Sequence, residues 1–92
     1  MISYFEYLSL TFFFFFFSLI ALHWASYVGN LNAVKFLIRN GAKLEQRDRK
    51  GRTPLLLASF SSQTPVLQFL RQKKANKDVE DFEGRVPNLS SI

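Results

Sequence analysis

Few residues in this chain of 92 could carry out chemistry. It contains one histidine, His23, and no cysteine. A lone histidine without thiols or carboxylates at ligand spacing does not make a metal site, and it lacks the partners of a nucleophilic centre. Four acidic residues gather near the C-terminus, where we expect a solvated hairpin: Asp78, Glu80, Asp81 and Glu83. We therefore expect no enzyme activity, no cofactor and no metal ion.

Charge is distributed unevenly along the chain. The net charge is +5, and from Lys35 to Lys77 there are eleven lysines and arginines against two acids. A basic middle suits a protein partner with an acidic surface, and the competing interpretation is that these residues only solubilise helix surfaces and loop tips. Nucleic acid is not the expected partner, because stacking platforms interleave single aromatics with basic residues, whereas Phe12 to Phe17 are consecutive.

Three similar segments recur along the chain at a constant spacing. This spacing, which we call one period, is the one that separates Leu22 from Leu55. The run GRTPLLLA from Gly51 to Ala58 matches Ala21 to Ala25 one period earlier and Gly84 to Pro87 one period later. Repeats with a period of about 33 residues are supersecondary units that bury their apolar faces by stacking on one another. The sequence therefore predicts a short solenoid.

Helix signals recur in step with this period. Thr53 can accept a hydrogen bond from a free N–H of the next turn, and Pro54 suits the first helical position, so a helix begins there. Residues 32–39 carry an apolar stripe at positions i, i+3 and i+4, which predicts a second packed helix. The pair Asn40-Gly41 indicates that this helix ends in a left-handed turn.

Residues Ala21 to Ile92 resemble ankyrin repeats, whose unit is a hairpin and two antiparallel helices, the first opened by a T-P-L-H-x-A motif. The matching residues are Leu22-His23-Trp24-Ala25, Asn40-Gly41-Ala42, Asp48, Gly51 and Thr53-Pro54-Leu55. The resemblance implies an all-α ankyrin-repeat helix-turn-helix stack with an apolar N-terminal helix. We divide the chain into a Phe-rich segment (1–19), a first repeat without its hairpin (20–47, unit one), a second repeat (48–80, unit two) and a truncated third (81–92).

Unit two departs from the ankyrin pattern where its helices end. Ser62 replaces the glycine between the two helices, and Lys74 replaces the glycine of Asn40-Gly41. A side chain in a left-handed conformation is strained, so we expect a less regular helix end from Gln72 to Ala75.

The resemblance also implies a binding face, because ankyrin proteins bind through their hairpin tips and the exposed end of the first helix. The matching positions, which we predict to contact a partner protein, are Tyr27, Val28, Arg49, Lys50, Arg52, Phe60 and Ser61. In the same family the histidine at the position of His23 makes hydrogen bonds within and between repeats. Trp24 occupies a usually apolar slot and is expected to pack rather than to bind.

The Phe-rich segment has two interpretations. Leu8 to Trp24 approaches the length of about 20 apolar residues that a membrane helix needs, which would make the protein membrane-associated. Alternatively, the segment is a gene-model artefact: phenylalanine codons are pyrimidine-rich, as is intron sequence before a splice acceptor, and the ankyrin resemblance begins abruptly at Ala21. Under either interpretation a continuous helix from about Tyr7 to Val28 is expected.

These observations favour a non-catalytic protein–protein interaction module. The alternatives are a fragment of the cytoplasmic ankyrin array of a transient receptor potential cation channel, which the run from Gly51 to Ala58 resembles, and a small membrane-anchored ankyrin protein. Because the chain lacks cysteine, we expect a cytoplasmic localisation.

Overall fold

Four helices make up the fold. The computed structural model describes residues 3–89, and in the first helix it describes the side chains of residues 4, 6 and 16–28. The helices are α1 (Tyr4–Val28), α2 (Leu31–Arg39), α3 (Pro54–Phe60) and α4 (Thr64–Gln72), and the described residues contain no strand. The all-α helix-turn-helix stack with an apolar N-terminal helix is therefore confirmed.

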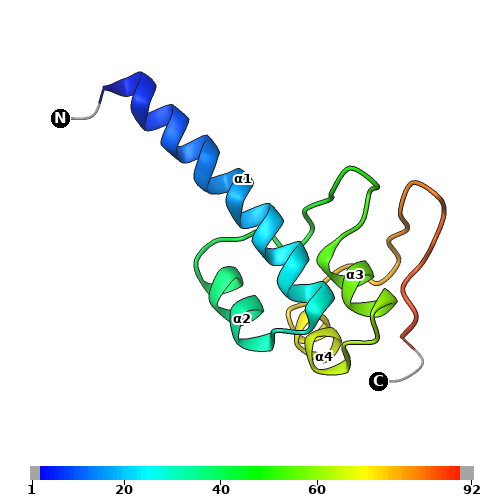
Figure 1. Ribbon diagram of the computed structural model, residues 1–92. Coiled ribbons are helices and arrows are strands. Elements are labelled where there is room, and N and C mark those ends of the chain that lie inside the picture. The colour runs from blue at the N-terminus through cyan, green and yellow to red at the C-terminus, as the bar shows by residue number, and fades with distance from the viewer. Residues whose placement is uncertain (1–2, 90–92) are drawn as a thin grey trace.

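Helix α1 is longer than an ankyrin helix, and its N-terminal half extends away from the other three (Figure 1). It begins with a capping box, in which the Ser3 hydroxyl accepts from the Glu6 N–H and the Glu6 carboxylate accepts from the Ser3 N–H. It ends at Gly29 in a left-handed conformation. The continuous helix predicted over residues 7–28 is confirmed, with three further residues at its start.

Among the residues that the structure describes in full, no helix is both long enough and apolar enough to cross a membrane. The predicted membrane segment Leu8 to Trp24 includes the side chains of residues 8–15, which lie outside those that the structure describes.

The two helix pairs share one core in which positions one period apart play the same part. Leu22 and Leu55, one period apart, are fully buried, as are Val34 and Leu67. Helix α1 packs against both α2 and α3, and α4 packs against α2 and α3. The core also includes Val66, Leu67 and Leu70 of α4. The helix pair of unit two therefore packs against the helix pair of unit one, as the repeat predicts.

The helix start predicted at Pro54 is confirmed. The Thr53 hydroxyl accepts a hydrogen bond from the Leu56 N–H at 3.2 Å, and Pro54 occupies the first turn. At the C-terminal end of α2, Gly41 has a φ of 98°, and the Ala42 N–H donates to the Leu37 carbonyl at 2.9 Å. This bond closes α2 with the left-handed motif that Asn40-Gly41 predicts.

The expectation of an irregular helix end from Gln72 to Ala75 was wrong. Lys74 adopts the left-handed conformation with a φ of 66°, and the Ala75 N–H donates to the Leu70 carbonyl at 3.0 Å. The same left-handed turn and the same hydrogen bond end α2, at Gly41 and Ala42. Burial of Leu70 and Ala75 in the common core holds the turn in place, although lysine favours it less than glycine does.

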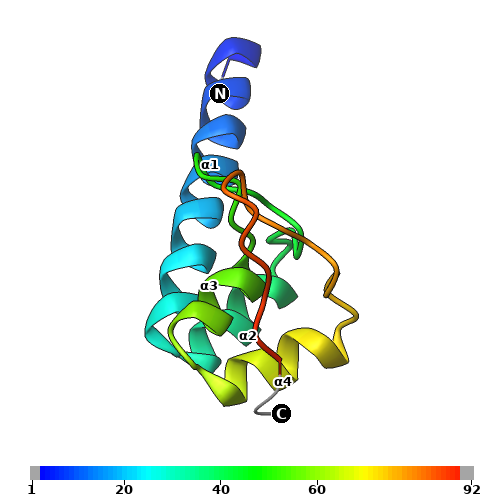
Figure 2. The ribbon, with the colours of Figure 1, turned by 90° about the vertical axis from the view of Figure 1, so that its right-hand side faces the viewer.

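The segment after α4 forms a hairpin and no helix within residues 78–89. Its tip lies beside the preceding hairpin, as the orange and green loops of Figures 1 and 2 show, and the Phe82 N–H donates to the Lys50 carbonyl at 3.0 Å. The expectation that all four acids are solvated was wrong for Asp81. Its buried carboxylate accepts from the Glu83 and Arg85 N–H groups, which fixes the hairpin turn.

Candidate binding face

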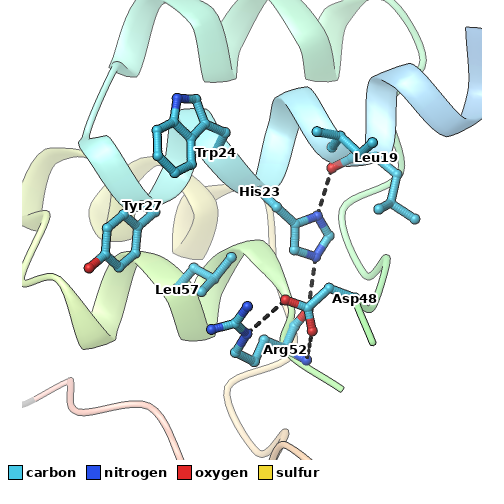
Figure 3. Close-up of a pocket in the computed structure, with 8 residues that line it drawn as sticks. Leu19, His23, Trp24, Tyr27, Asp48, Arg52 and Leu57 are labelled. Atoms are coloured by element: carbon cyan, nitrogen blue, oxygen red, sulfur yellow. Dashed lines mark hydrogen bonds and ion pairs between the residues drawn. The ribbon is translucent and has the colours of Figure 1, made fainter. Parts of the chain in front are cut away.

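A hollow of about 520 Å³ lies where α1, the hairpin before α3, and α3 meet (Figure 3). Two of its residues, Tyr27 and Arg52, belong to the predicted binding positions. The full lining consists of Leu19, Ile20, His23, Trp24, Tyr27, Asp48, Arg52 and Leu57. Residues from both units therefore form one surface, which neither unit provides alone.

Helix α1 supplies an aromatic pair at the edge of this hollow. Trp24 and Tyr27 are three residues apart and thus lie on one side of the helix. Their ring centroids are 6.3 Å apart and their planes differ by 20°, so the rings stack. Both are exposed, Trp24 by 66% and Tyr27 by 46%. Exposed rings of this size are the side chains that most often anchor protein–protein contacts.

The hairpin before α3 supplies a guanidinium that is held in place. One carboxylate oxygen of Asp48 accepts from the Lys50 and Arg52 backbone N–H groups, both at 2.9 Å. The other accepts from Arg52 Nε at 2.7 Å. These three hydrogen bonds to the Asp48 carboxylate close the turn and hold the Arg52 side chain at the hollow, as Figure 3 shows.

The same contacts set the protonation of Asp48. Burial acts to raise the pKa of this carboxyl group, but hydrogen bonds from the backbone and side chain of Arg52, and from the Lys50 backbone, outweigh it. The pKa of Asp48 therefore lies below its ordinary value, and the ion pair with Arg52 is intact at neutral pH.

His23 connects α1 to this hairpin. Its Nδ1 lies 2.8 Å from the Leu19 carbonyl oxygen on its own helix, and its Nε2 lies 2.8 Å from the Arg52 carbonyl oxygen of unit two. The predicted hydrogen bonding of His23 within and between repeats is confirmed. The ring therefore fixes the position of Arg52 relative to the aromatic pair. No group of three or more potential metal ligands occurs in the part of the chain that the structure describes.

The remaining predicted binding positions do not line the hollow. Val28 and Phe60 are exposed at the ends of α1 and α3, and Arg49 and Lys50 are exposed at the hairpin tip. The guanidinium of Arg85 covers the Phe60 ring at 5.2 Å from its centroid. The Ser61 hydroxyl donates to the Leu57 carbonyl at 2.9 Å and so helps to end its own helix.

Sequence reasoning missed most of the lining, above all Trp24. We expected this ring to pack, but it is exposed, because no helix pair of the described chain covers it. Two spacings in the sequence could have predicted these lining residues. Trp24 lies three residues before Tyr27, and Leu57 lies one period after Trp24. Both flank the hollow in the structure.

Comparisons with known proteins agree with the fold. A family model described as ankyrin repeats (3 copies) matches residues 10–81. Protein phosphatase 1 regulatory subunit 27 of Homo sapiens is 37% identical over 70 residues, which are 76% of this chain and 46% of that protein. Transient receptor potential cation channel subfamily A member 1 of Homo sapiens is 36% identical over 64 residues, 70% of this chain and 6% of the channel.

A third relative is palmitoyltransferase ZDHHC13 of Mus musculus, which is 41% identical over 59 residues, 61% of this chain and 10% of the enzyme. This chain thus spans less than half the length of each of these three relatives.

Proposed function

This chain belongs to the ankyrin-repeat family and is thereby a protein-interaction module, and we propose that it binds its partner through the hollow between α1 and α3. The observation that carries this proposal is the stacked pair Trp24 and Tyr27 beside the fixed guanidinium of Arg52. Large exposed rings supply apolar contact area at low entropic cost, and a held arginine loses little freedom when it binds.

We propose a non-catalytic role for the chain. Two polar side chains that line the hollow already serve the fold: His23 joins the two units, and Asp48 closes the hairpin turn. Neither is left free to exchange protons with a substrate or to activate a nucleophile. The relative named as a regulatory subunit supports the same conclusion.

The chemistry of the face fits a partner segment that is apolar at its centre and acidic at its edge. Trp24 and Tyr27 would receive the apolar part, while Arg49 and Lys50 at the hairpin tip would face the acidic part. Charges at the rim of an interface mainly raise the rate of association and set orientation. The acidic character of the partner and the cytoplasmic localisation stay predictions.

The name of the first relative indicates a partner to test, protein phosphatase 1. We would measure its binding to this chain by calorimetry, with Tyr27→Ala as the main variant. Loss of an aromatic anchor should weaken binding at least about tenfold, because interface hot spots are worth about 2 kcal/mol or more. The exposed Gln68 on α4 lies outside the hollow, so Gln68→Ala should leave the affinity within about twofold.

Equal affinity for wild type and Tyr27→Ala would reject the hollow as the binding face. Absence of any binding would reject protein phosphatase 1 as the partner. In that case the same pair of variants would be compared against proteins captured on the immobilised chain.

A second candidate role is that of one piece of a channel's ankyrin array. The specific observation is the similarity to transient receptor potential cation channel subfamily A member 1, which extends over 64 residues. Sequencing of the full transcript tests this role. Several more repeats followed by six apolar spans would support the channel, and repeats alone would favour an adaptor protein.

A further inference from the structure

The net positive charge of the chain is concentrated on one layer of the fold. The whole chain has twelve lysines and arginines and seven acids. Residues 31–42 and 64–75, which contain α2 and α4 with their closing turns, carry no acid, and outside them basic and acidic residues are equal in number. The two helices pack against each other in the lower part of the molecule, away from the hairpin tips (Figures 1 and 2). We call their basic side chains the basic layer: Lys35, Arg39, Arg71, Lys73 and Lys74.

The outer side of α2 combines this charge with an exposed ring. Asn32, Phe36 and Arg39 are exposed and recur at i, i+4 and i+7, so they lie along one side of the helix. Val34, on the opposite side, is fully buried. Phe36 is 63% exposed, and Arg39 follows it by three residues and Lys35 by four. The outer side of α2 therefore presents an aromatic ring next to two cations.

On α4 the counterpart of this ring gathers two cations from different units. The Lys35 ammonium lies 5.7 Å from the centroid of the Phe69 ring, and the Lys73 ammonium lies 5.6 Å from it. Like charges that converge in this way repel each other. No residue of the basic layer forms an ion pair with a carboxylate in the described part of the chain. An anion close to Phe69 is therefore attracted by both ammonium groups.

We propose that the basic layer docks the chain on a membrane that contains anionic phospholipids. The negatively charged headgroups pair with the basic side chains, and the Phe36 ring enters the interfacial region among them. The centre of the contact lies at Phe69, between Lys35 and Lys73. The association is peripheral, because it uses the outer surface of α2 and α4 and requires no helix to cross the bilayer.

The freedom of these cations favours a fluid partner over an acidic protein. Arg52, beside the hollow, is held by Asp48 at 2.7 Å. The side chains of the basic layer have no such carboxylate, and four of the five belong to exposed residues. A shaped protein site gains most from fixed, forked donors, whereas lipid headgroups can move to meet mobile ones. The basic layer therefore matches a fluid anionic surface better than a shaped acidic site.

The basic layer is separate from the proposed partner-binding hollow. Among the described residues that line the hollow, all come from α1, α3 or the hairpin before α3, and none from α2 or α4. Docking on a membrane therefore leaves Trp24 and Tyr27 free to contact a protein partner. Membrane docking and partner binding can thus succeed or fail independently of each other.

Co-sedimentation of the full chain with vesicles tests this docking. We expect binding to vesicles of phosphatidylserine and phosphatidylcholine, and at least about tenfold weaker binding to phosphatidylcholine alone. Lys73→Gln together with Lys74→Gln should weaken binding about 20-fold, because each basic residue near an anionic surface contributes about fivefold. The matched control is Arg49→Gln with Lys50→Gln. It removes the same charge from the hairpin tip and should change binding less than about threefold, because salt screens distant charges.

Tryptophan emission reports which side of the molecule meets the membrane. Phe36→Trp combined with Trp24→Phe gives a chain whose only tryptophan lies on α2. Its emission should shift to shorter wavelength with anionic vesicles. The emission of wild-type Trp24, which lines the hollow, should stay the same. Raising the ionic strength from about 0.1 M to about 0.5 M should release the chain from the vesicles.

Circular dichroism checks that each variant is folded, and Lys35→Gln with Lys73→Gln replaces the first pair if that pair is not. Equally strong binding to phosphatidylcholine alone, or equal losses for the layer variant and the hairpin control, would overturn the proposal. A shift of the wild-type Trp24 emission without one at residue 36 would do the same, since it assigns the contact to the hollow. Binding to soluble poly-glutamate without binding to anionic vesicles would assign the basic layer to acidic proteins instead.

Discussion

Unit one and unit two end their helices in the same way with different residues. The left-handed positions of unit one are Gly29 and Gly41, with φ values of 81° and 98°. Those of unit two are Ser62 and Lys74, with φ values of 58° and 66°. The packed helix pair requires a sharp turn at these points, and it imposes the turn even on residues that resist it. Tertiary packing therefore outweighs a local preference of about 1 kcal/mol.

The units differ more strongly before their first helix. Unit two begins with the hairpin in which Asp48 fixes Arg52, and the third segment repeats this geometry, with Asp81 Oδ2 accepting from Arg85 Nε at 2.7 Å. Unit one has helical residues at these positions. Trp24 is exposed, whereas its counterpart Leu57 is buried, because α3 packs against α1.

The largest expected effect tests whether the two units form a single core. Leu22→Ala and Leu55→Ala each remove a fully buried side chain, and each should lower the free energy of unfolding by about 2 to 5 kcal/mol. Urea denaturation followed by circular dichroism measures both. Phe36→Ala, at an exposed position, should cost less than about 0.5 kcal/mol. A large loss for only one leucine would show that the units unfold separately.

The next effect compares two glycines that share a left-handed backbone but differ in surroundings. A Cβ atom at Gly51 would lie 2.6 Å from the Phe82 ring, whereas one at Gly41 would meet nothing within 4 Å. Gly41→Ala should cost about 1 kcal/mol from backbone strain alone. Gly51→Ala should cost about 2 to 3 kcal/mol, because the Phe82 ring must also move. Equal losses in thermal unfolding would contradict the packing of Phe82 on Gly51.

Smaller changes of opposite sign are expected at the strained positions of unit two. Ser62→Gly and Lys74→Gly should each raise the free energy of unfolding by about 0.5 to 1 kcal/mol, since relief of left-handed strain exceeds the added entropy of the unfolded chain. Ser61→Gly is the control, because the φ of Ser61 is −100° and the change should destabilise the protein. Stabilisation by all three changes would exclude strain as the cause.

The smallest expected effect is the pH dependence of the stability that Asp48 contributes in the hairpin before α3, which unit one lacks. The folded-state pKa of Asp48 is lowered, so its stabilising contribution is present above the unfolded-state pKa of about 3.9 and is lost as the pH falls through the folded value. Asp48→Asn should therefore lower stability at neutral pH by up to about 1 kcal/mol, and its effect should shrink as the pH falls below the unfolded-state pKa. A constant difference across this range would show that charge plays no part.

Most of the helices could be predicted from the sequence, because their signals are local. The helix predicted over residues 32–39 begins one residue earlier, at Leu31, and the cap at Thr53 is as predicted. The candidate site was harder to predict. Tyr27 and Arg52 line the hollow, but Trp24 was assigned to packing and Asp81 to solvent, and both assignments failed. Exposure of a side chain depends on which segment covers it, and a local pattern does not contain that information.

The repeat period by itself determined the architecture of this protein: which residues form helices, where those helices begin, and which apolar positions meet in the core. These features follow from backbone capping and from side chains that repeat in register. Only the tertiary structure decided that Lys74 accepts a left-handed turn, that the Asp81 carboxylate is buried, and that Trp24, Tyr27 and Arg52 meet around one hollow. Each of these outcomes depends on contacts between segments far apart in the chain, whose free energy exceeds the local preferences that a sequence shows.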